Sequence, residues 1–128
     1  MNVGSTNMKK ILVVDDDPYI LMSLEFLMKK SGNEVMIARN GTEALEIIAN
    51  NKPDLVLLDI MMPDVDGYSI CKHIKQTKEL KDIIVVFLSA KTHEADIEKG
   101  YKLGAAKYIS KPFSTRELMK DVKELLGQ

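Results

Sequence analysis

The sequence predicts an α/β fold in which a parallel sheet of five strands is covered by five helices on its two faces. Short apolar runs alternate five times with segments of helical periodicity. The runs are rich in Val, Ile and Leu, which is typical of strands buried on both faces. Side-chain capping signals open several of the helical segments. This alternation favours a doubly wound sheet with right-handed crossovers.

The first strand is expected at 10–14, where four apolar residues follow one another. Asp17 is the expected N-cap of the first helix and Pro18 its first residue, because proline lacks only a hydrogen bond that this position does not make. The helix is expected to end near Ser31 and Gly32. Helical spacing predicts that this helix buries Ile20, Leu24, Leu27 and Met28.

The second strand is expected at 34–38. Asn40 and Glu43 have the spacing of a capping box that opens the second helix. Its predicted buried stripe consists of Ala44, Leu45, Ile48 and Ala49. Pro53 closes that helical segment, and the third strand is expected at 54–58.

The third helix is expected after Gly67, with Ile70 and Ile74 on its buried face. Further along, the sequence predicts a strand at 83–88, a helix at 92–103 and a short strand at 107–109. Gly104 has the place of a left-handed helix cap. Ser114 and Glu117 form the clearest capping box and open the last helix, whose shared face carries Leu118, Val122 and Leu125.

Length and composition indicate one cytoplasmic domain. The chain has 128 residues, which is enough for a single core, and its net charge of -1 gives no field that would attract nucleic acid or an anionic membrane. No apolar stretch is long enough to span a membrane, and no secretory signal opens the chain. The lone cysteine, Cys71, is typical of a reducing compartment. Residues 1–8 are expected to be a flexible N-terminal segment.

Carboxylates follow two of the apolar runs at the point where each run ends. Asp15 and Asp16 come directly after the first strand, and Asp59 follows the third. Because the carboxyl ends of parallel strands share one edge of the sheet, we expect these acids to lie close together. Crowded carboxylates raise one another's pKa values, and a hard divalent cation relieves the repulsion. The sequence therefore predicts a Mg²⁺ site at this edge.

Ser89 follows the fourth strand and Lys111 the fifth, so both belong to the same edge. Three acids, a metal ion and one fixed lysine are suited to handling a phosphoryl group. If Asp15 and Asp16 only capped the first helix, the acid at Asp59 would remain unexplained. A calcium loop with Gly67 as its sixth residue would begin at Met62 and end at His73, which removes the acids that calcium requires.

Four stretches resemble the receiver domains of two-component response regulators. They are Ile11-Leu12-Val13-Val14-Asp15-Asp16, Leu58-Asp59-Ile60-Met61-Met62-Pro63 with Gly67, Leu88-Ser89-Ala90, and Tyr108-Ile109-Ser110-Lys111-Pro112-Phe113. The resemblance implies a receiver domain over residues 9–127 with a flavodoxin-like fold and the strand order 2-1-3-4-5. It also implies a cis peptide bond between Lys111 and Pro112.

By this resemblance, Asp59 accepts a phosphoryl group from the phosphohistidine of a partner. Asp15, Asp16 and Asp59 would hold Mg²⁺ together with the backbone carbonyl of Met61. Lys111 and the Ser89 hydroxyl would each contact a phosphoryl oxygen. Ser89 and Tyr108 would form the output switch, in which the serine moves toward the phosphate and the tyrosine ring turns inward.

One face of the first helix is expected to bind the partner. At 100 degrees per residue, Tyr19, Met22, Ser23 and Phe26 lie opposite the buried side. Exposed apolar patches of this kind mark interaction sites. The resemblance implies that this helix docks the helical bundle that carries the donor histidine, and that Pro112 and Phe113 belong to the same partner-binding surface.

Three function classes fit this architecture. An aspartate-nucleophile phosphatase would require a second acid two residues after Asp59, where this chain has Met61. A flavodoxin-like cofactor carrier would require a phosphate loop rich in Ser, Thr and Gly after the first strand, where this chain has three acids. We therefore favour a signalling phosphoacceptor that is not an enzyme beyond catalysing its own phosphorylation and dephosphorylation.

The implied partners are a sensor histidine kinase or a histidine phosphotransfer protein, and a downstream protein target. The net charge and the lack of a long apolar stretch predict that this domain contacts neither nucleic acid nor membrane. Three readings stay open: a single-domain signalling protein that binds a target, a member of a phosphorelay, or a receiver cut from a longer regulator or hybrid kinase.

Overall fold

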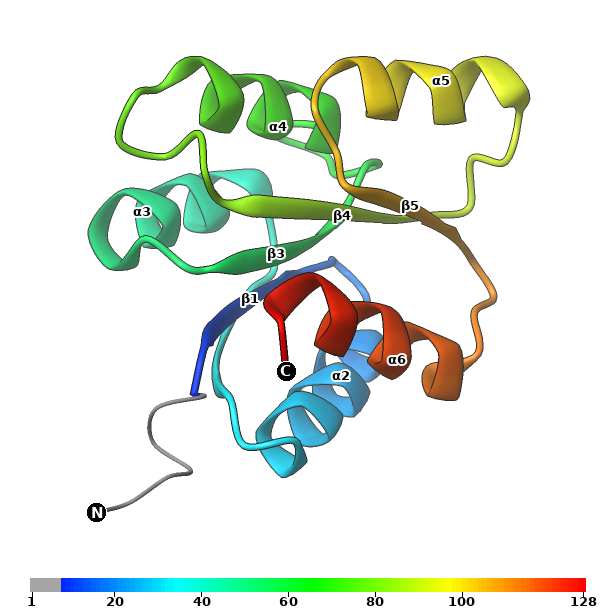
Figure 1. Cartoon of the computed structure of the whole chain (residues 1–128). Coiled ribbons are helices and arrows are strands. Elements are labelled where there is room, and N and C mark those ends of the chain that lie inside the picture. Colours follow the sequence, from blue (N-terminus) through cyan, green and yellow to red (C-terminus); the bar gives the residue numbers. More distant parts are fainter. Residues whose placement is uncertain (1–7) are drawn as a thin grey trace.

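The computed structural model describes residues 8–128. Apart from Met8, the predicted flexible segment 1–8 lies outside the described residues. Within residues 8–128, five parallel strands form one sheet in the order β2-β1-β3-β4-β5, with five helices on its two faces (Figure 1). The predicted fold class, a flavodoxin-like doubly wound sheet with the strand order 2-1-3-4-5, is confirmed.

Strands and helices alternate along the whole described chain. In order, they are β1 (Lys10–Val14), α2 (Pro18–Lys30), β2 (Glu34–Ala38), α3 (Gly41–Asn51), β3 (Leu55–Asp59), α4 (Gly67–Gln76), β4 (Ile84–Ser89), α5 (Glu94–Lys102), β5 (Lys107–Ser110) and α6 (Thr115–Leu126). β3 and β4 each begin and end one residue later than expected, and β5 is one residue longer. The helix expected at 92–103 is shorter at both ends, and His93 is its N-cap with an extended backbone.

The two faces of the sheet carry two separate hydrophobic clusters. Figure 1 shows α2 and α6 on one face and α3, α4 and α5 on the other. Successive strand residues alternate between the faces, so Ile11 and Val13 pack toward α2 and α6, while Leu12 and Val14 pack toward the other helices. Among the described residues, no helix is long and apolar enough to cross a membrane.

Side-chain caps are present at the start of the three helices for which the sequence predicts them. The carboxylate of Asp17 accepts the backbone N–H of Tyr19, and the side chain of Asn40 accepts that of Glu43. The carboxylate of Glu43 in turn accepts the N–H of Arg39, the residue before the cap, so the predicted capping box forms with its return bond shifted by one residue. Ser114 caps α6 by accepting the Glu117 N–H. Gly104 has a φ of 108°, which confirms the predicted left-handed cap.

The buried faces of three helices differ in part from the prediction. In α2, Leu21 is buried together with Leu24 and Met28, whereas Ile20 and Leu27 are half-buried. Spacing by three and four residues places the first three on one line toward the sheet, and Ile20 and Leu27 flank that line.

The other two differences also follow from helix geometry. In α3, Ala49 is exposed because it lies about 100 degrees around the helix from the buried Ile48. In α6, Leu126 is buried and Leu125 is half-buried. Sequence spacing identifies the apolar side of a helix. It fixes the rotation of the helix about its own axis, relative to the sheet, only to within about one residue.

Candidate functional site

The sheet register brings the ends of four strands to one place. Asp15 follows the last residue of β1, and Asp59 is the last residue of the neighbouring β3. Ser89 ends β4, where it pairs with Ser110 of β5. The Lys111 backbone N–H donates to the Ser89 carbonyl at 2.8 Å, which places the lysine beside β4. The parallel topology therefore gathers all four predicted residues on the carboxyl edge of the sheet.

The three predicted acids form one cluster. Asp15, Asp16 and Asp59 each offer a carboxylate oxygen, and these oxygens all lie within 4.8 Å of one another. Asp15 and Asp59 are buried, and Asp16 is exposed. Closely placed carboxylate oxygens with one exposed member suit a hard cation that retains several water ligands, as Mg²⁺ does. The donor set therefore fits the predicted ion.

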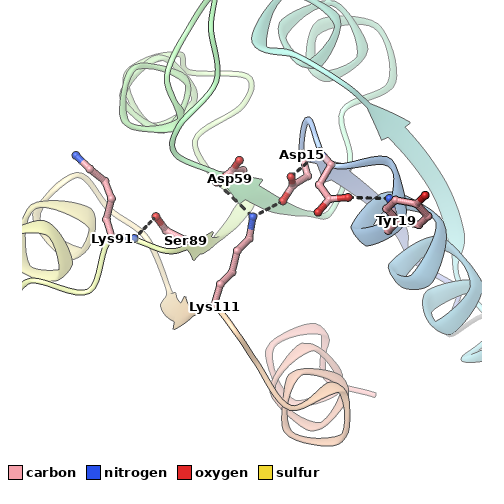
Figure 2. A network of polar contacts seen from close by, with 7 residues as sticks. Asp15, Tyr19, Asp59, Ser89, Lys91 and Lys111 are labelled. Atoms are coloured by element: carbon pink, nitrogen blue, oxygen red, sulfur yellow. Dashed lines mark hydrogen bonds and ion pairs between the residues drawn. The ribbon is translucent and has the colours of Figure 1, made fainter.

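Lys111 supplies the positive charge that faces these acids. Its ammonium nitrogen Nζ donates to Oδ2 of Asp15 at 2.7 Å and lies 3.7 Å from Oδ1 of Asp59. Figure 2 shows the side chain reaching from the end of β5 to a point between the two carboxylates. The Lys111–Pro112 peptide bond is cis, as the resemblance implied. The lysine is therefore within reach of any group bound at Asp59.

Burial raises the pKa of Asp59 to about 6, and the charges of Asp15 and Asp16 act in the same direction. Lys111 and a backbone N–H at Ile60 oppose this change. Only 5% of the Asp59 surface is exposed, so its charged form is poorly hydrated. A cation bound at the cluster would favour the charged form, because it would neutralise the crowded carboxylates.

Ser89 and Tyr108 meet at the backbone of Lys91. The Ser89 hydroxyl accepts the Lys91 N–H at 3.0 Å, and the Tyr108 hydroxyl donates to the Lys91 carbonyl at 2.6 Å. Figure 2 shows the Lys91 side chain pointing away from Lys111. Both predicted switch residues are buried, and Tyr108 is turned inward. Their response to phosphorylation stays a prediction.

The loop after Asp59 is held in place by Asp64, a residue that sequence reasoning missed. Met61 lies on this loop with an exposed side chain. The Asp64 carboxylate accepts the backbone N–H groups of Gly41 and Thr42 and the Thr42 hydroxyl, at 2.7 to 3.0 Å. These hydrogen bonds, led by that of the hydroxyl, hold the pKa of Asp64 far below its usual range. The sequence signal for this contact was an acid in the loop, because a carboxylate is stabilised near the start of a helix.

The predicted partner face is exposed. Tyr19, Met22 and Phe26 are 76%, 62% and 63% exposed, and Ser23 is exposed as well. Tyr19 and Ser23 also line a mostly apolar cavity of about 580 Å³ together with Pro112 and Phe113. The fold thus brings four of the six predicted partner-binding residues together beside Lys111, while Met22 and Phe26 lie outside this cavity.

The fold and the site define a class of protein: a flavodoxin-like sheet with three carboxylates and a lysine at its carboxyl edge is the arrangement expected of a signalling receiver. The family model of the response regulator receiver domain matches residues 11–123. The chain belongs to this family, as its four motifs indicated.

Known proteins resemble this chain in sequence and in structure. The chain is 44% identical over 118 residues to the alkaline phosphatase synthesis transcriptional regulatory protein PhoP of Bacillus subtilis (strain 168), covering 92% of this chain and 48% of that protein. It therefore spans about half the length of that relative.

Solved receiver domains are similar as well. The receiver domain of a Francisella response regulator is 34% identical with a TM-score of 0.86, covering 93% of this chain and 97% of that one. The signal receiver domain of a DNA-binding response regulator from Colwellia psychrerythraea 34H is 31% identical with a TM-score of 0.88, covering 94% and 99%. The receiver fold therefore extends over nearly the whole chain.

Proposed function

We propose that the protein is a two-component phosphoacceptor in which Asp59 receives a phosphoryl group from a partner phosphohistidine. The environment of Asp59 is the observation that supports this proposal most directly. It is a buried carboxylate at a strand end, with two further acids and the Lys111 ammonium group beside it. Buried acids without a task are costly, and such perturbed groups gather at functional sites.

In the proposed reaction, one carboxylate oxygen of Asp59 attacks the phosphorus atom of the phosphohistidine. The new O–P bond makes an acyl phosphate, the N–P bond breaks, and the imidazole leaves as the neutral ring after taking up a proton. Lys111, already 3.7 Å from Asp59, would pair with one phosphoryl oxygen, and the Ser89 hydroxyl would donate to another. Hydrolysis of the acyl phosphate returns the carboxylate, so the protein is changed and restored without acting on another substrate.

Asp15, Asp16 and Asp59, with the backbone carbonyl of Met61, would hold Mg²⁺. When bound, Mg²⁺ would neutralise negative charge on the transferring phosphoryl oxygens. The exposed Met61 side chain is apolar, so it cannot orient a water molecule for attack on the phosphoryl group. This favours a phosphoryl group that persists long enough to be read by a partner.

Labelling tests the proposal. The full chain with Mg²⁺ and acetyl phosphate is expected to gain the mass of one phosphoryl group, and peptide mapping is expected to place it on Asp59. The bond should be stable to acid and labile to base and hydroxylamine, as acyl phosphates are. A label on another residue, or an acid-labile label typical of phosphohistidine, would contradict the assignment.

The metal site has a separate test. Mg²⁺ is expected to raise the melting temperature of the parent protein, because binding to the folded state stabilises it. The Asp16→Ala variant should show little or no increase with Mg²⁺, while its melting temperature in EDTA should equal or exceed that of the parent, since one crowded charge is gone. Thermal scans with and without Mg²⁺ measure both values. Equal increases in parent and variant would place the ion elsewhere.

The proposed partners are a sensor histidine kinase or histidine phosphotransfer protein as donor, and a protein target that reads the phosphorylated state. The donor's helical bundle would dock on Tyr19, Met22, Ser23 and Phe26 of α2, with Pro112 and Phe113 beside them. These residues are exposed or half-buried, and the cavity that four of them line, without Met22 and Phe26, opens next to Lys111. The PhoP relative is a transcriptional regulatory protein about twice as long, so a receiver of a longer regulator and a single-domain relay protein both remain as proposals.

Phe26→Ala tests the docking face. Removing this exposed ring should slow phosphoryl transfer from the cognate phosphohistidine protein by about tenfold, the effect of losing a moderate interface contact. Labelling by acetyl phosphate should be unchanged, because the small donor needs no docking face. Rapid-quench kinetics with both donors measures the two rates. Lys72→Ala, an exposed change on α4, serves as the control. An equal fall in both rates for Phe26→Ala would mean that the residue is structural.

The output switch would begin at Ser89. Phosphoryl oxygens at Asp59 offer its hydroxyl a charge-assisted hydrogen bond, stronger than a neutral one. Because Ser89 and Tyr108 both bond to the Lys91 backbone, movement of Ser89 would shift this loop and the α5–β5–α6 face that a target reads.

A further inference from the structure

Tyr108 is held by α5 and the loop before it at three separate points. Its hydroxyl donates to the carbonyl of Lys91 in the loop before α5. Its ring lies beside Gly100, in the last turn of that helix. Its backbone N–H donates to the hydroxyl oxygen of Tyr101 at 3.1 Å. One residue of β5 thus contacts both the loop before α5 and the last turn of α5.

Gly100 leaves the space that the Tyr108 ring occupies. It is buried inside α5, where glycine destabilises a helix relative to alanine. A Cβ atom at this position would lie 2.9 Å from Cδ2 of Tyr108 and 3.1 Å from Cδ2 of Phe87, closer than packed carbon atoms approach. Glycine, a poor helix residue, therefore stands where a side chain on α5 would meet the Tyr108 ring.

Phe87 cannot give way at this contact. Its ring is fully buried and packs edge-on against Tyr68 with ring centres 5.5 Å apart, and it lies 5.9 Å from the Tyr108 ring. Tyr108 belongs to β5, the last strand of the sheet order, and its outer side is a groove of about 1040 Å³ between β5 and α6. The Tyr108 ring is therefore the group that a side chain at position 100 would displace.

Tyr101 fixes the backbone beneath that ring. Its side chain is 45% exposed, so burial alone does not hold it in place. The N–H that it accepts belongs to a strand at the edge of the sheet, where no neighbouring strand can supply a carbonyl on the outer side. The Tyr101 hydroxyl takes the part of that missing strand and ties the end of α5 to β5.

We propose that Gly100 and Tyr101 are positioning residues for Tyr108, and that the absence of a side chain at position 100 is what permits the inward orientation of the Tyr108 ring. With a methyl group there, the ring turns outward over the groove between β5 and α6. The signalling consequence rests on the proposed function, since this face would be read by a target. The placement of the ring itself is independent of phosphorylation.

Fluorine NMR of the unphosphorylated full chain, labelled with fluorotyrosine, tests the proposal. The chain has four tyrosines, and Tyr108→Phe assigns the signal of interest. Tyr68, which is 6% exposed, and Tyr19, which is 76% exposed, serve as buried and exposed standards. In the parent, broadening of the Tyr108 signal by a soluble paramagnetic agent should match Tyr68, and in Gly100→Ala it should approach Tyr19. A signal that stays protected in Gly100→Ala overturns the proposal.

A thermal double-mutant comparison separates packing from helix propensity. Gly100→Ala should lower the melting temperature of the parent because of the clash. In a Tyr108→Ala background the contact with the tyrosine ring is absent, and the space left by that ring lets Phe87 move aside. The same change should then raise the melting temperature by about 4 °C through helix propensity. A change of the same sign in both backgrounds contradicts the assignment.

Tyr101→Phe tests the backbone contact. Loss of one hydrogen bond should speed exchange of the Tyr108 amide proton roughly fivefold, with the Ser89 amide as an unaffected reference. Unchanged exchange would remove Tyr101 from the proposal. Because no phosphoryl group is present in any of these measurements, failure of Asp59 to accept one would leave their outcome unaltered.

Discussion

Replacing Asp59 by asparagine is expected to abolish phosphoryl labelling by acetyl phosphate completely. The amide has nearly the same shape as the carboxylate but lacks the nucleophilic oxygen that forms the acyl phosphate. Asp15 and Asp16 remain in the variant, so residual labelling would show that another acid of the cluster can serve as acceptor. Asp82→Asn, a change at an exposed aspartate outside the site, should label as the parent does.

The same variant should change stability in a pH-dependent way. The pKa of Asp59 is raised from 3.8 to about 6 in the folded protein, mainly by burial. A raised pKa means that Asp59 contributes stability below about pH 4, and that this contribution is lost as the pH rises through about 6. A neutral asparagine avoids that loss. In EDTA at pH 8, Asp59→Asn should therefore be more stable than the parent by about 2–3 kcal/mol.

Urea unfolding in EDTA measures this difference. It should shrink steadily between pH 6 and about pH 4, where Asp59 in the parent becomes protonated. Addition of Mg²⁺ at pH 8 should stabilise the parent more than the variant, since the ion favours the charged carboxylate. A difference that grows as the pH falls would contradict the assigned direction of the pKa change.

Gly67→Ala is expected to destabilise the protein by about 3 kcal/mol or more, among the largest effects that a single methyl group can have. Gly67 opens α4, and its N–H donates to the carbonyl of Ile60. An added Cβ would lie 2.4 Å from the carbonyl oxygen of Asp59 and 2.8 Å from Cα of Ile60. Both are backbone atoms at the end of a central strand, so neither a rotamer change nor a small side-chain movement relieves the contact.

The acceptor should be disturbed together with the fold. Moving the Asp59 backbone away from the new methyl group displaces its carboxylate from Asp15 and Lys111, so labelling should slow in whatever protein remains folded. Gly127→Ala is the control, because a Cβ there meets open space and only the positive φ of 71° opposes it, at a cost of about 1 kcal/mol. Urea unfolding of the two variants distinguishes a steric clash from backbone strain. Similar values for both would mean that α4 shifts to accommodate the methyl group.

Much of the site follows from the sequence because strand ends in a parallel sheet have a fixed place. Once 10–14 and the run before Asp59 are recognised as parallel strands, Asp15 and Asp59 must come to the same edge. The capping residues Asp17 and Asn40 were also readable, since each acts on backbone groups two or three residues away. Local chemistry of this kind needs no knowledge of the rest of the fold.

Contacts between distant parts of the chain were not readable in the same way. Asp64 looked like part of a loop, and its bond to Thr42 depends on how α3 lies beside that loop. The buried face of α2 was placed about one residue from its true position, because the angle between a helix and a sheet depends on all the side chains between them. Gly100 gave no sign of its role, since the ring that it receives belongs to a later strand.

The sequence by itself determined the order of strands and helices, most helix starts, and the set of three acids, a serine and a lysine at the carboxyl ends of the strands. It did so because apolar periodicity and capping act over a few residues. Only the tertiary structure decided that Lys111 pairs with Asp15, 96 residues away, and that Tyr108 turns inward onto Gly100. Such pairs form because close packing leaves each side chain one available space, and that space exists only when the whole chain has folded.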